Sequence, residues 1–194
     1  ETLFHGMMPF LHDCPPSPRL AVKPGTISMR VSPELADIRP VILGAVVRGV
    51  EIDEDVIKRL MEHQEKLHFA LGRGRKRASI GVHDLGKIAP PFRVEAVGRD
   101  HSFIPLAMDE EMTIDEILEN HPKGVDYAHL LQGMEKVPII FDANDSVLSF
   151  PPIINGDHTT VTTDTRDIFI DVTGLDNRAC ESALMLICLQ LSIL

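Results

Sequence analysis

The chain has 194 residues, of which 44% are hydrophobic and 25% charged, and its formal net charge is −10. This composition indicates a globular protein with a full-sized core and excludes a disordered chain, a collagen and a disulfide-stapled miniprotein. The negative charge argues against a surface that binds duplex nucleic acid as a whole, and leaves room for a local basic patch. No run of 18 apolar residues is present, so we expect no helix that spans a membrane.

Cysteine usage and the chain ends define the expected setting. Cys14, Cys180 and Cys188 are an odd number without CxxC spacing, which is typical of a reduced, cytoplasmic protein. No metal site is predicted, because HExxH and ligand-spaced Cys/His clusters are absent from the sequence. The chain begins at Glu1 and ends in an apolar run, so we expect a piece of a longer polypeptide whose last helix is truncated.

Five prolines stand in the first 24 residues. Proline fixes φ and removes a backbone donor, so we predict a connector over residues 1–24 and one domain over residues 25–194. In that domain, apolar alternation or continuous apolar runs predict strands at 26–31, 41–50, 78–83, 92–97, 137–141, 147–150 and 166–173. Helical spacing and capping residues predict helices at 53–71, 113–119, 125–131 and 177–194. Strands outnumber helices and do not alternate with them, which favours the α+β class.

A basic cluster follows the first predicted helix. Its four cations are Arg73, Arg75, Lys76 and Arg77. Arginine binds phosphate through two parallel hydrogen bonds, and the neighbouring glycines allow close backbone approach, so the cluster is a candidate phosphate-binding loop. From spacing alone the pattern favours a solvated turn after a helix, because cations also suit the C-terminal end of a helix.

Two further segments carry polar groups at strand ends. Residues 149–158 (SFPPIINGDH) leave a strand through two prolines and turn at Asn-Gly, which suits either a stiff pocket wall or an ordinary loop. Asp171 and Thr173 share one face of a strand, where they could hold a polar ligand group or simply end an edge strand. His83, next to Asp84, is interpreted as a core or turn histidine.

Six blocks together resemble one known family, the β subunits of archaeal and eukaryotic phenylalanyl-tRNA synthetases. In chain order they are QEKLH (64–68), GRGRKR (72–77), SIGVHDL (79–85), VLSFPPIING (147–156), TTDT (162–165) and IFIDVTG (168–174). They keep the order of the family and cover about residues 36–190. The matching region is the tRNA-editing domain of that subunit, formed by its third and fourth modules. The resemblance implies a three-layer β/β/α sandwich with mixed and antiparallel sheets.

The resemblance also implies an activity: hydrolysis of the ester that joins a wrong amino acid, tyrosine, to phenylalanine tRNA. The implied partners are the 3′ end of this tRNA and the α subunit, in a heterotetramer of two α and two β chains. The site of aminoacylation lies on the α subunit, so ATP and magnesium are expected only in the rest of the synthetase, and no cofactor is expected in this chain. A non-catalytic module that positions tRNA or assembles the heterotetramer is the alternative.

Four positions match the editing pocket of archaeal members: Ile140, Ser149, Asp171 and Thr173. By this resemblance, Asp171 accepts the phenol proton of tyrosine, Thr173 and Ser149 orient the substrate or the attacking water, and Ile140, where the family pattern has Leu, packs against the ring. Tyrosine differs from phenylalanine by one hydroxyl, which an apolar pocket rejects by only about 10²-fold. A pocket that requires the hydroxyl discriminates by about 10⁴–10⁵, since phenylalanine leaves a buried acceptor unpaired. The basic cluster becomes a candidate site for the 3′-end phosphates of the tRNA.

Overall fold

The structure, a computed structural model, describes residues 22–192. Nearly all of the predicted connector, residues 1–21, and the last two residues of the predicted final helix lie outside the described residues. Two sheets make up most of the strand structure. A three-stranded antiparallel sheet has the order β2 (Val41–Arg48), β10 (Asp167–Gly174) and β3 (Ala78–Asp84). A five-stranded sheet has the order β1 (Met29–Val31), β4 (Phe92–Gly98), β7 (Lys136–Phe141), β8 (Val147–Phe150) and β9 (Ile154–Asn155).

The second sheet is mixed, because β1 pairs with β4 in parallel and all its other pairings are antiparallel. The short strands β5 (Ser102–Phe103) and β6 (Met112–Thr113) form a separate pair. The helices are α2 (Glu54–Ala70), α3 (Ile114–Asn120), α4 (Pro122–Tyr127) and α5 (Asn177–Ser192). Within residues 22–192, four short 3-10 helices complete the description: η1 (Pro33–Ala36), η2 (Leu85–Lys87), η3 (Ala128–Leu131) and η4 (Asp157–Thr159).

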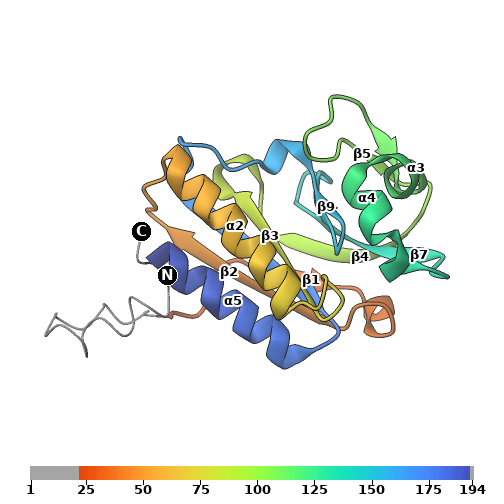
Figure 1. Cartoon of the computed structure of the whole chain (residues 1–194), viewed down its shortest axis with the longest axis horizontal. Helices are drawn as coiled ribbons and strands as arrows, with labels where there is room; N and C mark the ends of the chain where they lie inside the picture. Colours follow the sequence, from red (N-terminus) through yellow and green to blue (C-terminus); the bar gives the residue numbers. More distant parts are fainter. Residues whose placement is uncertain (1–21, 193–194) are drawn as a thin grey trace, which may run out of the picture.

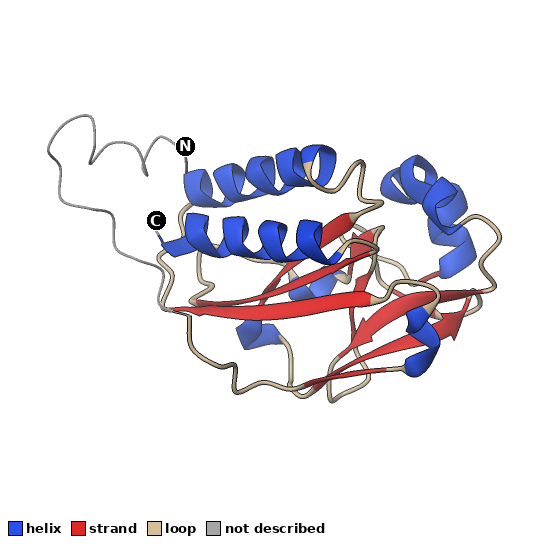
Figure 2. Ribbon diagram, turned by 90° about the horizontal axis from the view of Figure 1, so that it is seen from below, coloured by secondary structure: helices blue, strands red, loops and turns tan. Residues whose placement is uncertain are grey.

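Strand β10 shows how the layers form. Ile168, Ile170 and Val172 face α2 and α5 and share one core with them, whereas Phe169 lies in a second core between the two sheets. Successive strand residues point to opposite faces, so one strand serves both cores. Figure 1 and Figure 2 show α2 and α5 side by side over one face of the three-stranded sheet. The predicted α+β class and three-layer β/β/α sandwich are confirmed. The same alternation places Asp171, one step after Ile170, on the face that looks toward the other sheet.

Local signals account for most element boundaries. The Asp53 side chain accepts a hydrogen bond from the Val56 amide at 2.7 Å and begins α2, and Thr113 and Glu116 form the predicted capping box of α3. The predicted helix over 125–131 is two elements, since α4 begins earlier, at Pro122, and gives way to η3. Pro122 has a φ suited to the first helical turn, and the preceding His121 side chain caps that turn, which explains the earlier start.

Candidate functional site

A cavity of about 320 Å³ lies between α2, the edge strand β3 and the segment that leaves β8. Its walls are mostly apolar, and a limited set of polar side chains reaches it. These polar residues are Gln64, Glu65, His68, Arg75, Ser79, Lys123, Ser149, Asn155, Thr159, Thr160 and Asp171. The volume falls within the range of about 300–1,000 Å³ that is usual for small-molecule sites.

The free edge of β3 forms one side of the cavity. Because β3 pairs only with β10, the backbone groups of Ile80 that point outward need other partners. Two side chains of α2 supply them: Gln64 Nε2 donates to the Ile80 carbonyl at 2.7 Å, and His68 Nε2 accepts from the Ile80 amide at 2.9 Å. The acceptor role of Nε2 places the ring proton on Nδ1, and burial lowers the pKa of His68, so the ring is neutral at pH 7.

Asp171 is the most deeply placed carboxylate of the cavity, with 1% of its surface exposed. Its strand neighbours in register are glycines on both sides, Gly44 in β2 and Gly81 in β3. A Cβ atom at Gly81 would collide with Asp171 Oδ2, so only glycine leaves room for the carboxylate there. Oδ2 lies 2.7 Å from His83 Nε2, while Oδ1 accepts no hydrogen bond from any residue of the described range 22–192. One oxygen of a buried carboxylate is therefore left for a ligand.

Ser149 reaches the same cavity from β8. Its hydroxyl donates to Asn155 Oδ1 at 3.2 Å across the β8–β9 pair, and both side chains line the cavity. Directly after β8, the peptide bond between Pro151 and Pro152 is cis. This segment is the predicted stiff wall, and the structure places it beside the cavity rather than in an exposed loop.

Thr173 and Ile140 lie outside the cavity lining. The Thr173 hydroxyl accepts a hydrogen bond from Arg39 Nε at 2.7 Å and lies 3.1 Å from the Ser79 hydroxyl. Ile140 is fully buried in the core between the sheets, directly across from Ser149 on the neighbouring strand. The structure thus brings Asp171 and Ser149 to one cavity and places the other two predicted residues in the packing around it.

Arg39 was not predicted from the sequence. Its guanidinium is 5% exposed and donates to Thr173, to the Ser79 hydroxyl and to the backbone carbonyl of Arg75. Burial lowers the pKa of Arg39 to about 10, and the nearby Asp171 charge opposes that shift. An isolated arginine before Pro40 has no sequence signal, because every acceptor that it uses comes from a distant part of the chain.

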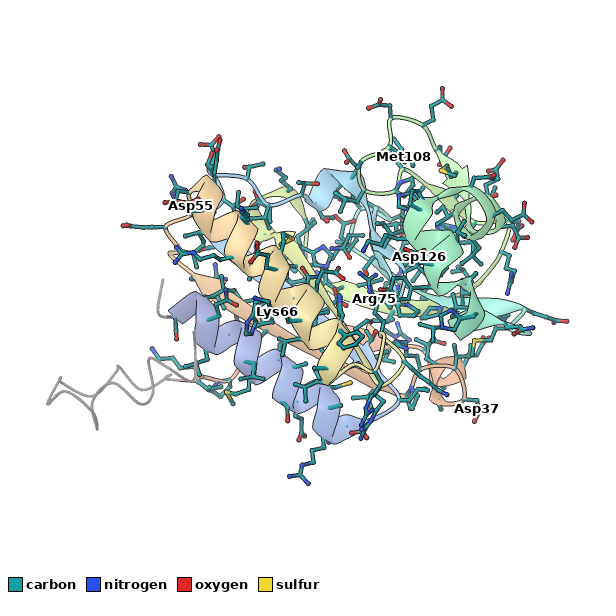
Figure 3. All side chains as sticks on the ribbon, in the orientation of Figure 1. Asp37, Asp55, Lys66, Arg75, Met108 and Asp126 are labelled. Carbon is teal, nitrogen blue, oxygen red and sulfur yellow. The ribbon has the colours of Figure 1, made fainter. Side chains whose placement is uncertain are left out.

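The predicted basic cluster divides into buried and exposed members. Arg75 is 6% exposed and donates to Glu65 at 2.8 Å and to the Ile153 carbonyl at 2.7 Å, and its guanidinium lies 4.3 Å from the Tyr127 ring centre. Figure 3 shows Arg75 between the end of α2 and α4. It therefore joins three segments around the cavity, a role that its position in a basic run did not indicate.

The other three cations of this cluster are exposed: Arg73, Lys76 and Arg77. Arg77 is already paired with Asp176, whose carboxylate it contacts through Nε at 3.1 Å. The backbone at residues 73–75 has positive φ throughout, 51°, 63° and 67°. This left-handed turn sends Arg75 inward while its neighbours point to solvent, and it costs free energy at the two positions that are not glycine.

Glu65 marks the exposed side of the cavity. Its Oε1 lies 2.8 Å from Arg75 Nη2, 3.6 Å from His68 Nδ1 and 3.7 Å from Lys123 Nζ. His68 and then the Arg75 and Lys123 charges lower the pKa of Glu65 to about 2, against the opposing effect of partial burial. Glu65 is therefore ionised at neutral pH.

Two other findings bear on the range 22–192. No helix there is long and apolar enough to cross a membrane. Within the same residues, no group of three or more His, Cys, Asp or Glu side chains is arranged to hold a metal ion.

This fold and cavity define a class of protein: the chain belongs to the B3/4 domain family, whose family model matches residues 43–187. Its relatives are β subunits of phenylalanine–tRNA ligase. The protein of Methanosarcina acetivorans is 56% identical over 158 residues, and that of Archaeoglobus fulgidus is 48% identical over 169 residues. The resemblance to the synthetase β subunit is thereby confirmed.

A solved structure agrees with the sequence relatives. An N-terminal fragment of the phenylalanyl-tRNA synthetase β subunit from Pyrococcus horikoshii superposes with a TM-score of 0.87 at 40% identity, and the match covers 90% of this chain and 51% of that fragment. The Methanosarcina match covers 81% of this chain but only 29% of that subunit, and the Archaeoglobus match covers 31% of its subunit. The chain therefore spans about a third of the length of these relatives.

Proposed function

We propose that this chain is the editing module of a phenylalanine–tRNA ligase β subunit, and that it hydrolyses the ester of tyrosyl-tRNA(Phe). The observation that carries the proposal is Asp171: a carboxylate buried at an apolar cavity, with Oδ1 free of any partner among the described residues. A phenol hydroxyl donates the hydrogen bond that this oxygen lacks. Phenylalanine would leave the same oxygen buried and unpaired, at a cost that favours tyrosine strongly.

The reaction requires little beyond positioning. In our proposal the oxygen of a water molecule attacks the ester carbonyl carbon, the bond from that carbon to the ribose oxygen breaks, and the ribose oxygen leaves with a proton. The products are tyrosine and uncharged tRNA. The chemistry needs no cofactor, and we expect ATP and magnesium to act elsewhere in the ligase. The protein would hold the substrate at two ends, the tyrosine phenol and the tRNA, and so keep the ester next to the attacking water. Such positioning supplies a large part of the rate of a hydrolysis.

The other site residues take supporting roles in this proposal. Ser149 lies in the cavity wall and orients the substrate or the water, and Asn155 holds its hydroxyl. Thr173 acts indirectly: its hydroxyl accepts a hydrogen bond from Arg39, which also donates to the cavity residue Ser79. Ile140 supports β8 from the core between the sheets and so sets the position of Ser149.

Partners follow from the same proposal. The exposed cations Arg73, Lys76 and Arg77 contact the 3′-end phosphates of tRNA(Phe), whereas Arg75 is engaged by protein acceptors and shapes the cavity. In the cell the module acts in the cytoplasm, within a heterotetramer of two α and two β subunits.

The test is to incubate the chain with tRNA(Phe) charged with labelled tyrosine or labelled phenylalanine and to follow the loss of each ester. We expect rapid release of tyrosine and little release of phenylalanine. Asp171→Asn, which keeps the shape of the side chain and removes its charge, is expected to reduce tyrosine release by at least 10²-fold. Tyrosine release at the rate seen in buffer alone would reject hydrolysis and favour the non-catalytic module. Equal release of both amino acids would reject the role given to Asp171.

A further inference from the structure

We propose that His83 is a positioning residue of this site: it holds the Asp171 carboxylate so that Oδ1, and not Oδ2, is presented to the phenol of the substrate. The inference rests on the proposed function. It adds a residue that the sequence identified only as a core or turn histidine.

His83 and Asp171 meet because of the pairing between β3 and β10. In register His83 lies opposite Phe169, and Asp171 lies opposite Gly81, so the two side chains are diagonal neighbours on one face. Gly81 carries no side chain between them, and a Cβ atom there would come within 2.7 Å of His83 Nε2. His83 Nε2 and Asp171 Oδ2 are 2.7 Å apart, and the two residues are 0% and 1% exposed. Among residues 22–192, Oδ2 has no other hydrogen-bond partner.

The other ring nitrogen of His83 is also held. Nδ1 lies 2.9 Å from the Thr159 hydroxyl oxygen, and that hydroxyl donates its single proton to the Gly156 carbonyl at 3.0 Å. Each ring nitrogen of His83 therefore has a hydrogen-bond partner, the Thr159 hydroxyl at Nδ1 and the Asp171 carboxylate at Nε2.

This arrangement lowers the free-energy cost of burying the Asp171 carboxylate. An unpaired carboxylate in an apolar environment is costly, and the cost falls when an oppositely charged or donating partner is hydrogen-bonded to it. His83 supplies the hydrogen-bond partner of one Asp171 oxygen and leaves the other as an acceptor. Since Thr159 also lines the cavity, His83 connects the carboxylate to a second segment of the cavity lining.

The experiment compares His83→Leu with His83→Gln in the chain, with tyrosyl-tRNA(Phe) and phenylalanyl-tRNA(Phe) as substrates. Glutamine keeps a donor near the place of Nε2, whereas leucine keeps only the volume. We expect His83→Leu to lower kcat/KM for the tyrosyl ester by about 10- to 100-fold, the range for loss of a hydrogen bond to a charged group. We expect His83→Gln to recover most of that activity. Release of phenylalanine should not decrease in either variant, so the preference for tyrosine should narrow.

A double-mutant cycle separates positioning from general damage to the fold. If His83 acts through Asp171, adding His83→Leu to Asp171→Ala should change the rate no further, because the group that it positions is gone. Additive reductions in rate, or a His83→Leu variant with the parent's preference for tyrosine, would overturn the inference. Circular dichroism and thermal unfolding of each variant restrict the comparison to folded proteins.

Rejection of the positioning role of His83 can be distinguished from rejection of the proposed hydrolase activity. A parent chain that does not release tyrosine rejects the hydrolase. Coupling between His83 and Asp171 can then still be measured from the unfolding free energies of Thr159→Val, His83→Leu, Asp171→Ala and their pairs, with no substrate present. Independent, additive effects in that cycle would reject the pairing itself, and a tyrosine-releasing parent with unchanged His83 variants would reject only the positioning role.

Discussion

The cavity has two carboxylates in opposite settings. The Asp171 side chain is 2% exposed and has one hydrogen-bond partner, whereas the Glu65 side chain is 49% exposed and faces His68, Arg75 and Lys123. In the buried setting, the loss of one hydrogen bond is costly, because the surroundings are of low polarity and few other partners are within reach. In the exposed setting, solvent screens each pair, and several contacts are needed to perturb one group. We therefore expect changes at the buried end to have the larger effects, on specificity and on stability, and changes at the exposed side to have smaller effects, on stability and on tRNA binding.

The largest effect should come from the buried end. Gly81→Ala puts a methyl group where Asp171 Oδ2 lies, so the carboxylate must move away from His83. We expect tyrosine release to fall by more than 10-fold and the free energy of unfolding to fall by about 1–3 kcal/mol, which is typical of overpacking. The measurements are tRNA deacylation and urea unfolding.

The control for this change is Gly25→Ala, since nothing lies within 4 Å of a Cβ atom there. It should leave both quantities unchanged. Parent-like tyrosine release by Gly81→Ala would mean that the carboxylate does not need its observed position.

A smaller effect is expected at the exposed side. Glu65 has a pKa lowered from 4.5 to about 2, first by His68 and then by the Arg75 and Lys123 charges, so these contacts stabilise the fold above pH 4.5, and this contribution disappears as the pH falls toward 2. Because Glu65 is half exposed, we expect Glu65→Gln to cost only about 1 kcal/mol at pH 7. The difference in unfolding free energy between the two proteins should shrink between pH 4.5 and 2.

Chemical unfolding at a series of pH values measures this difference. Glu62→Gln, an exposed position on the same helix, is the matched control. A difference for Glu65→Gln that stays constant down to pH 2 would contradict a Glu65 pKa lowered by His68, Arg75 and Lys123.

The smallest effect concerns two of the three exposed cations of the basic cluster, Arg73 and Lys76, since the third, Arg77, is paired with Asp176. Replacing Arg73 and Lys76 by glutamine should not change the rate at saturating tRNA. It should make the salt dependence of tRNA binding shallower, by about 0.7 in log K per log salt for each phosphate that the protein no longer neutralises. Binding measured at several salt concentrations gives this slope. Lys58→Gln serves as the control, because Lys58 is an exposed cation that lies about three turns before the end of α2. An unchanged slope in the double variant would show that Arg73 and Lys76 are solvated and do not contact phosphates.

Local sequence patterns predicted the elements well. Asp53 and Thr113 satisfy the first amides of their helices within three residues, and the alternation around Ile170 assigns each side chain of β10 to one face, so both signals depend only on sequence neighbours. Short elements such as β5 and β9 were missed, since two residues carry no periodicity. The parallel pairing of β1 with β4 was also beyond local pattern, because it depends on packing between segments some 60 residues apart.

The features of the site also separate into those that the sequence predicted and those that only the structure revealed. By itself, the sequence determined that Asp171 and Thr173 share one face of a strand and that a proline-stiffened segment follows Ser149, since both follow from strand period and backbone restriction. Only the tertiary structure decided that Arg75 turns inward, that Arg39 holds Thr173, and that His83 bonds to a residue 88 positions away. These contacts join segments whose distance in the chain is large, and the packed sheets and helices, rather than any local preference, bring them within hydrogen-bonding range.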